Sequence, residues 1–99
     1  MTKPQHFFVE LLGTRPDWPE RMTPEEERVM DEHFAYLKRL VAGRKVLLAG
    51  PCFEPVFGLI ILETENEAEA LAIMENEPSV AGGAHTYRLH PMRVSLMAG

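Results

Sequence analysis

The sequence has one cysteine, Cys52, among its 99 residues. A single thiol excludes an internal disulfide and a thiolate metal cluster built by one chain, and it fits a reducing compartment, so we expect a cytoplasmic protein. A long hydrophobic run is also missing. The apolar stretch that ends near Leu12 is too short, and wrongly flanked, for a signal peptide or a membrane span, so we expect no membrane partner.

Basic runs and ligand-binding motifs are missing as well. The formal net charge is −5 and lysine and arginine never form a block, so the footprint of a nucleic-acid-binding protein is lacking. His6, His85 and His90 do not fall at the spacings of metal ligands, and the last two would point to opposite sides of one strand. Gly82-Gly83 is an isolated pair rather than a phosphate-binding loop. We expect no nucleic acid, no metal and no cofactor.

What is present is the composition of one ordinary globular domain, with 45% hydrophobic and 25% charged residues. A chain of this length leaves no room for a second core, so we predict a single domain over residues 1–99. Such a domain buries only roughly two thirds of its unfolded surface, and a second subunit that covers an apolar face would supplement the core. We therefore expect an oligomer.

The N-terminal half predicts a strand, a loop and a long helix. Residues 5–12 are β-prone and run into turn residues. Two prolines keep residues 16–22 out of regular structure, and a tryptophan in such a loop, here Trp18, usually packs as a lid. Thr23 as the N-cap, followed by Pro and Glu, predicts a helix over residues 24–42. Its expected buried stripe consists of Val29, Met30, Phe34, Leu37, Leu40 and Val41.

The C-terminal half predicts a hairpin, a second helix and a last strand. We expect Pro51 and Pro91 each to end a strand, because proline cannot donate to a ladder. The third strand has no polar alternation until Glu63, which indicates burial on both faces and implies a partner sheet. The expected segments are strands over residues 44–50, 56–63 and 84–90, and a helix that begins after Thr64 or Asn66 and ends before Asn76, with Ala68, Leu71, Ala72 and Met74 as its apolar set.

The resulting order βαββαβ predicts an α+β fold. The rules for connections between elements close these strands into an antiparallel sheet with both helices on one face. No repeat or low-complexity segment interrupts this order.

His33 is the candidate general base. It lies in the first predicted helix, where a lone histidine near an apolar stripe is more often a hydrogen-bonded core residue than a catalyst. Glu77 follows the second helix, and the proline behind it fixes how the carboxylate leaves that helix. A carboxylate there would orient the imidazole and leave one ring nitrogen basic, as proton abstraction requires. The sequence distance leaves open whether the two residues meet, and the alternative is an exposed acid at a helix end.

The segment from Gly50 to Phe53 is a second candidate. Gly50 would let a bare backbone approach a ligand, although the same residues are equally an ordinary hairpin turn. Cys52 has no cationic neighbour in sequence that would activate its thiol, so we do not expect a nucleophile there.

Three motifs follow one another along the chain: His33-Phe34-Ala35-Tyr36-Leu37, Leu48-Ala49-Gly50-Pro51 and Glu77-Pro78-Ser79-Val80-Ala81-Gly82-Gly83, followed by Pro91. With these motifs in this order, the chain resembles the YCII-related (YciI-like) family over nearly its whole length. The resemblance implies a ferredoxin-like fold that forms a dimeric α/β barrel through its sheet faces, and a histidine–acid pair beside a cleft.

The chain departs from the family pattern at two positions. Glu77 stands where the family has aspartate, and it is one methylene longer and has more side-chain freedom to lose. Met30 stands where the family often has arginine, which puts an anion-binding role at that position in doubt.

The best-understood relative of this kind looks like a dehydrochlorinase that acts on a chlorinated hydroquinone-type aromatic. The first hypothesis is therefore a lyase-type, cofactor-free enzyme that abstracts a proton from, or eliminates a group from, an unsaturated or aromatic metabolite. In it His33 is the base, Glu77 orients it, and Trp18, Gly50, Pro51 and Phe53 are cleft walls.

Other classes of function stay open. One is a non-catalytic dimer that binds or senses a small molecule in the same cleft. Another is an interaction protein, which a cleft filled by side chains such as Trp18 would favour. A monooxygenase on the same barrel rests on analogy of fold alone.

Overall fold

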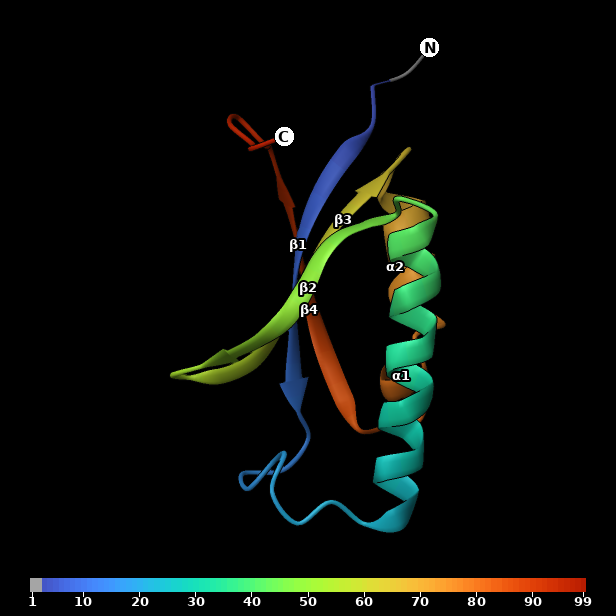
Figure 1. Cartoon of the computed structure of the whole chain (residues 1–99), viewed down its shortest axis with the longest axis vertical. Helices are drawn as coiled ribbons and strands as arrows, with labels where there is room; N and C mark the ends of the chain where they lie inside the picture. The colour runs from blue at the N-terminus through green and yellow to red at the C-terminus, as the bar shows by residue number, and fades with distance from the viewer. Residues whose placement is uncertain (1–2) are drawn as a thin grey trace.

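The computed structural model describes residues 3–99, which form four strands and three helices (Figure 1). The predicted order βαββαβ and the α+β class are confirmed, with a one-turn helix added before the last strand. The elements are β1 (Gln5–Gly13), α1 (Pro24–Ala42), β2 (Val46–Phe53), β3 (Val56–Thr64), α2 (Glu67–Glu75), α3 (Pro78–Ala81) and β4 (His85–Met92).

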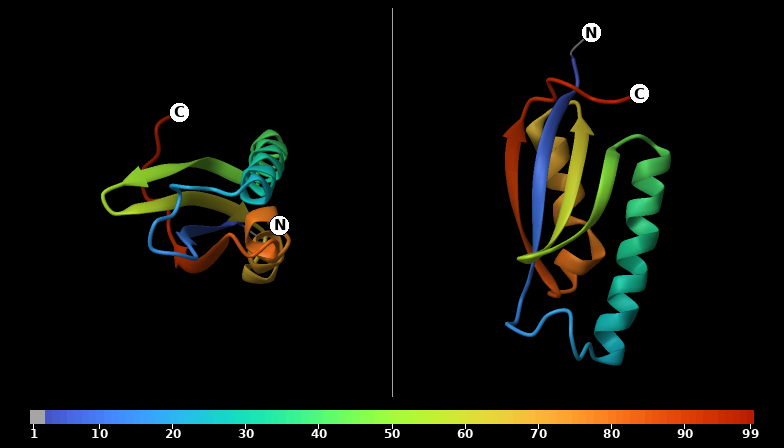
Figure 2. Two further views of the ribbon diagram at one scale, coloured as in Figure 1. Left: turned by 90° about the horizontal axis from the view of Figure 1, so that it is seen from below. Right: turned by 60° about the vertical axis from the view of Figure 1, so that its left-hand side comes forward.

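The strands form one antiparallel sheet in the order β2-β3-β1-β4. The helices α1 and α2 lie side by side on the same face of this sheet, as both views in Figure 2 show. This is the ferredoxin-like arrangement. No helix among residues 3–99 is long and apolar enough to cross a membrane.

Alternation along the two central strands builds the core. Every second residue of β1 and β3 faces the helices, because side chains along a strand alternate between its two faces. Five of these side chains are at most 2% exposed, and they are Phe7, Val9, Leu11, Ile60 and Leu62.

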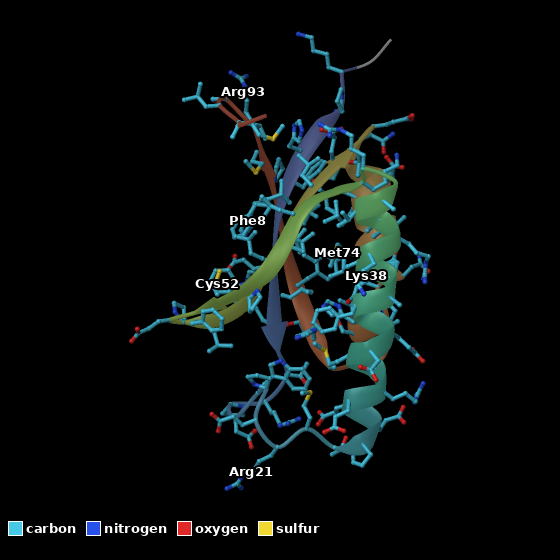
Figure 3. All side chains as sticks on the ribbon, in the orientation of Figure 1. Phe8, Arg21, Lys38, Cys52, Met74 and Arg93 are labelled. Carbon is cyan, nitrogen blue, oxygen red and sulfur yellow. The ribbon has the colours of Figure 1, made fainter. Side chains whose placement is uncertain are left out.

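The face of the sheet away from the helices is also apolar. Figure 3 shows Phe8 on the side of the sheet away from the helices, opposite Met74 of α2. Ile61 and Leu59 of β3 are half-buried on the same face as Phe8, and Leu48 of β2, the register partner of Ile61, is exposed there. The continuous apolar run of the third strand therefore leaves one apolar face uncovered by residues 3–99.

The first helix begins where its cap predicts. The Thr23 hydroxyl accepts the backbone N–H of Glu26 at 3.1 Å, and the Glu26 carboxylate accepts the backbone N–H of Thr23 at 2.9 Å. This reciprocal capping box satisfies donors that the first turn would leave free.

The buried stripe of α1 differs in part from the expected one. Val29 and Leu37 are buried as predicted, and His33 is buried between them. Phe34 and Val41 are 60% and 50% exposed, contrary to prediction. They line an open cleft between α1 and the sheet, so the helix has an apolar side that the chain itself does not cover.

Two strands continue through the prolines that were predicted to end them. β2 runs through Pro51 to Phe53, and β4 runs through Pro91 to Met92. Both are edge strands, where a missing N–H on the outer side costs no ladder hydrogen bond. The start of β2 at Val46 rather than at Arg44 reflects a positive φ of 59° at Arg44, which belongs to the turn after α1.

The second helix is capped by Asn66, whose side chain accepts the N–H of Glu69 at 2.8 Å. Its buried residues are Ala70 and Met74, of which only Met74 belongs to the expected apolar set. The other three residues of that set, Ala68, Leu71 and Ala72, are exposed. The helix α3 was not predicted from the sequence, because four residues are too few to show a helical period.

Candidate active site

A cleft of about 410 Å³ opens between α1, the β2–β3 hairpin and the loop after β1. Its lining is mainly apolar, and two imidazoles, His33 and His85, interrupt it. Other lining residues include Leu11, Gly13, Trp18, Pro19, Met30, Phe34, Leu37, Lys38, Val41, Ala49, Gly50, Pro51, Val56, Phe57, Gly58, Leu59 and Ile60.

His33 reaches this cleft from the buried side of α1. Its Nδ1 lies 2.5 Å from Oε1 of Glu77, and both side chains are almost wholly buried. Since a carboxylate only accepts, Nδ1 carries the proton and donates it to Glu77. In the neutral ring the proton is then absent from Nε2.

Glu77 is held by its own local structure. It precedes α3 as the N-cap residue, and Oε2 accepts the backbone N–H groups of Ser79 and Val80, each at 3.2 Å. Oε2 also accepts the Ser79 hydroxyl, and Oε1 accepts His33. The carboxylate therefore accepts four hydrogen bonds, three at Oε2 and one at Oε1, in a side chain that is 0% exposed.

Ser79 connects this pair to a second histidine. The single hydroxyl proton of Ser79 goes to Glu77, so Oγ is left to accept. His85 Nδ1 lies 2.8 Å from that oxygen and donates to it. The ring centroids of His33 and His85 are 5.9 Å apart.

Burial and hydrogen bonding set the charges of the network. Burial alone would raise the pKa of Glu77, but the hydrogen bonds from His33 and Ser79 and the charge of His33 outweigh it, so the pKa lies below the ordinary value. Glu77 is therefore ionised near neutral pH. For His85, burial lowers the pKa to about 4, helped by the positive charge that His33 carries when it is protonated and opposed by the charge of Glu77, so the His85 ring is neutral at pH 7.

The Nε2 atoms of both histidines remain open to the cleft. Neither atom makes a hydrogen bond within residues 3–99. Since every fully buried side-chain nitrogen and oxygen in that part of the chain has a hydrogen-bond partner, neither Nε2 atom is fully buried. Both rings line the cleft. The site thus presents two imidazole nitrogens to an apolar space.

Trp18 forms one wall of the cleft and does not fill it. The centroid of its ring lies 5.1 Å from that of the His85 ring, in an edge-to-face contact. The Arg15 guanidinium lies 5.1 Å from the centroid of the Trp18 ring. Arg15 also binds Glu26 of α1 and the carbonyl of Glu20. A Cβ at Gly13 would lie 2.4 Å from Cγ of Trp18, so only glycine leaves room for the indole.

Not all the residues predicted to form the cleft walls line the cleft. Gly50 and Pro51 line the cleft from β2, although as strand residues and not as a turn. Phe53 is 80% exposed at the end of β2 and is not among the lining residues. Met30 lines the cleft, so the position where the family often has arginine is apolar here.

Sequence reasoning missed Ser79 and His85 as members of the site. Ser79 follows Glu77 by two residues, the spacing at which a capping side chain meets its own backbone, and this was an available signal. His85 lies 52 residues from His33 and carries no local signal at all. Among residues 3–99 no group of three or more His, Cys, Asp or Glu side chains is arranged to hold a metal ion.

Comparisons with known proteins agree with this fold. A family model described as the YCII-related domain matches residues 7–93. No curated protein sequence matches the chain. Among solved structures, the 5-chloro-2-hydroxyhydroquinone dehydrochlorinase TftG from Burkholderia phenoliruptrix AC1100, in complex with 2,5-dihydroxybenzoquinone, is similar with a TM-score of 0.60. It is 21% identical, and the match covers 88% of this chain and 93% of that one.

Proposed function

Since the chain belongs to the YCII-related domain family, we propose that it is a small-molecule enzyme of the lyase type that needs no cofactor. Its substrate is an unsaturated or aromatic metabolite bound in the cleft between α1 and the sheet. His33 is the catalytic base, and Glu77 is the positioning residue that holds it.

The observation that carries the proposal is the buried hydrogen bond from His33 Nδ1 to Glu77. It fixes the ring so that the lone pair of Nε2 faces the apolar cleft. When Nε2 takes a proton, the ring becomes an imidazolium, and the adjacent carboxylate stabilises that charge. Since the side chains of His33 and Glu77 are only 8% and 0% exposed, this interaction is stronger than it would be at the surface.

The reaction is written as an elimination. Nε2 of His33 removes a proton from the substrate, and the electron pair of the broken bond forms a new double bond in the substrate. A leaving group on the neighbouring atom departs with its bonding pair as an anion. The imidazolium then returns its proton to water, so the enzyme ends as it began.

The likeness to TftG supports this class of reaction. That protein is named as a dehydrochlorinase and was solved with a quinone, and the cleft described above has the apolar lining that a flat ring requires. The cleft stays open beside Trp18, so the alternative of an interaction protein with a filled cleft has no support from it.

The first test is a screen of chlorinated hydroquinones, including 5-chloro-2-hydroxyhydroquinone, with chloride release as the readout. We expect turnover by the wild type and a loss of roughly 10²- to 10⁴-fold in His33→Gln, the usual contribution of a general base. His90→Gln, which changes an exposed histidine on the other face, is the matched control. A wild-type rate equal to that of His33→Gln would overturn the proposal for this substrate class.

A non-catalytic binding or sensing module is the second candidate. The apolar lining of the cleft favours it as much as it favours an enzyme, since that lining alone can hold a ligand. In this reading Nε2 of His33 only makes a hydrogen bond. Ligand binding without turnover in the wild type would decide for it.

We further propose that the uncovered face of the sheet joins two copies of the chain in a dimer. That face carries Phe8, Leu48, Leu59 and Ile61, and a monomer of this size gains core by burying such a patch. A symmetric contact between like faces closes on itself, as a dimer requires.

A further inference from the structure

We propose that His85 determines substrate specificity: its Nε2 accepts a hydrogen bond from a hydroxyl group on the ligand, beside the atom that His33 deprotonates. The inference rests on the proposed function, because it concerns the ligand of the same cleft. It adds a recognition element that the histidine–glutamate pair does not supply.

The hydrogen bonds that fix the His85 tautomer begin at the carboxylate of Glu77. Its Oε2 accepts two backbone N–H groups and the Ser79 hydroxyl, so the only proton of that hydroxyl is committed. Oγ of Ser79 can then only accept from the nitrogen 2.8 Å away, which is Nδ1 of His85. The proton of His85 is therefore on Nδ1.

The protonation of Nδ1 determines the state of the other ring nitrogen of His85, Nε2. Burial keeps the His85 ring neutral, with a pKa of about 4, so a single proton is shared between two nitrogens and Nδ1 holds it. Nε2 is a bare lone pair that accepts and cannot donate. A ligand carbonyl or ether oxygen at Nε2 would face another acceptor and form no hydrogen bond, whereas a ligand hydroxyl or N–H group would donate a hydrogen bond to Nε2.

The position of His85 makes this acceptor available to a ligand. The ring lines the cleft beside Trp18, and its centroid is 5.9 Å from that of His33. One small ring that presents a C–H or O–H to His33 therefore has a neighbouring substituent within reach of His85. A purely structural histidine would have both nitrogens paired with protein, and this one has Nδ1 alone paired among residues 3–99.

The first experiment determines the tautomer in the free protein. Long-range ¹H–¹⁵N spectra of the imidazoles at pH 7 distinguish a protonated ring nitrogen from a bare one, and loss of signals in His85→Gln assigns the ring. We expect Nδ1 protonated and Nε2 bare. In Ser79→Ala the acceptor is removed, so we expect a mixture of tautomers. A protonated Nε2 in the wild type would overturn the inference.

The second experiment measures selectivity for a hydroxyl donor. The probes are 2-naphthol and 2-methoxynaphthalene, which have similar size but differ in the O–H. We expect the wild type to prefer the naphthol by roughly three- to tenfold, the value of one neutral hydrogen bond, with a shift of the His85 Nε2 resonance on binding. His85→Phe should lose that preference, and His85→Gln, which has an amide oxygen, should recover part of it.

Two results would count against His85. One is an unchanged preference in His85→Phe with the Nε2 resonance unmoved in the wild type, which would assign the contact to His33. The other is the same loss of preference in His90→Gln, the control on the far face. Neither result touches the proposed function, which fails instead if His33→Gln retains turnover.

Discussion

Two histidine–glutamate pairs of this protein lie on opposite faces of one sheet. On the helix side His33 and Glu77 are 2.5 Å apart, with side chains that are 8% and 0% exposed; on the uncovered side His90 and Glu10 are 2.7 Å apart and 47% and 23% exposed. The distances are nearly equal. The surroundings differ. Of the two carboxylates, only the buried one also accepts hydrogen bonds from backbone N–H groups and from a serine, and of the two rings only the buried one adjoins a cleft.

Proximity of an acid and an imidazole therefore does not by itself hold the imidazole in one orientation. At the surface, water competes with the pair and salt screens it, so the ring is neither fixed nor activated. In the buried pair a closed set of hydrogen bonds fixes the tautomer and orientation. The predictions below test how far the two pairs differ.

The largest expected effect is on stability when each acid is removed. Glu77→Ala leaves the N–H groups of Ser79 and Val80 and the His33 ring without their acceptor in a buried place, and we expect a loss of about 3 kcal/mol or more. Glu10→Ala should change the free energy of unfolding by less than about 0.5 kcal/mol. Urea unfolding measures both, and equal effects would remove the distinction between the pairs.

The next prediction concerns pH. His85 has a pKa of about 4 when folded and about 6.5 when unfolded, so the unfolded chain binds more protons between these values and stability falls as pH falls through them. We expect a loss of up to roughly 3 kcal/mol across that window. The groups that face His85 are His33, Glu77, Ser79 and Trp18.

The contribution of His85 can be separated from that of Glu77. The pKa of Glu77 is lowered in the folded state, so its stabilisation is lost only as pH falls below its ordinary value of 4.5. Unfolding curves for wild type and His85→Gln between pH 7 and 4.5 isolate the histidine. A wild-type slope that persists in His85→Gln would show that another group is responsible.

A smaller effect is expected on the uncovered face. If this face joins two copies, Phe8→Glu places a charge in the contact and should weaken the dimer by roughly tenfold or more. Sedimentation at several concentrations measures it. Phe34→Glu, an exposed apolar position on the helix side, is the control and should leave assembly unchanged. A wild type that is monomeric throughout would refute the dimer.

The smallest effect is expected at the wall of the cleft. Arg15 ties the loop that carries Trp18 to α1 through Glu26, and its guanidinium lies against the indole. Arg15→Ala should weaken the binding of 2-naphthol by roughly two- to fivefold, as expected for a partly exposed ion pair. Arg28→Ala, which removes an exposed ion pair on α1, should leave binding unchanged.

Much of the fold was predictable because its signals are local. The capping box at Thr23 and the alternating strands act within a few residues of the chain, and the structure has them as predicted. The predicted ends of β2 and β4 were wrong, because proline is acceptable in an edge strand. The order of the strands in the sheet decides which strands lie at its edges.

The candidate site was predictable only in part, because the contacts that form it join residues far apart in the sequence. The two residues of the buried pair stand 44 positions apart, and their spatial pairing came from a family resemblance and not from spacing. The exposure of Phe34 and Val41 was missed because periodicity identifies an apolar side of a helix without saying whether the chain covers it.

The proposed function requires His33 to act as a base on a ligand that the cleft binds. The most direct measurement compares turnover of 5-chloro-2-hydroxyhydroquinone with calorimetric binding of 2,5-dihydroxybenzoquinone, in wild type and in His33→Gln. The account predicts a fall in turnover of at least roughly 100-fold, with affinity for the quinone changed by less than about tenfold, the most that one lost neutral hydrogen bond would cost. Turnover that survives in His33→Gln, or that falls only in proportion to affinity, would contradict it.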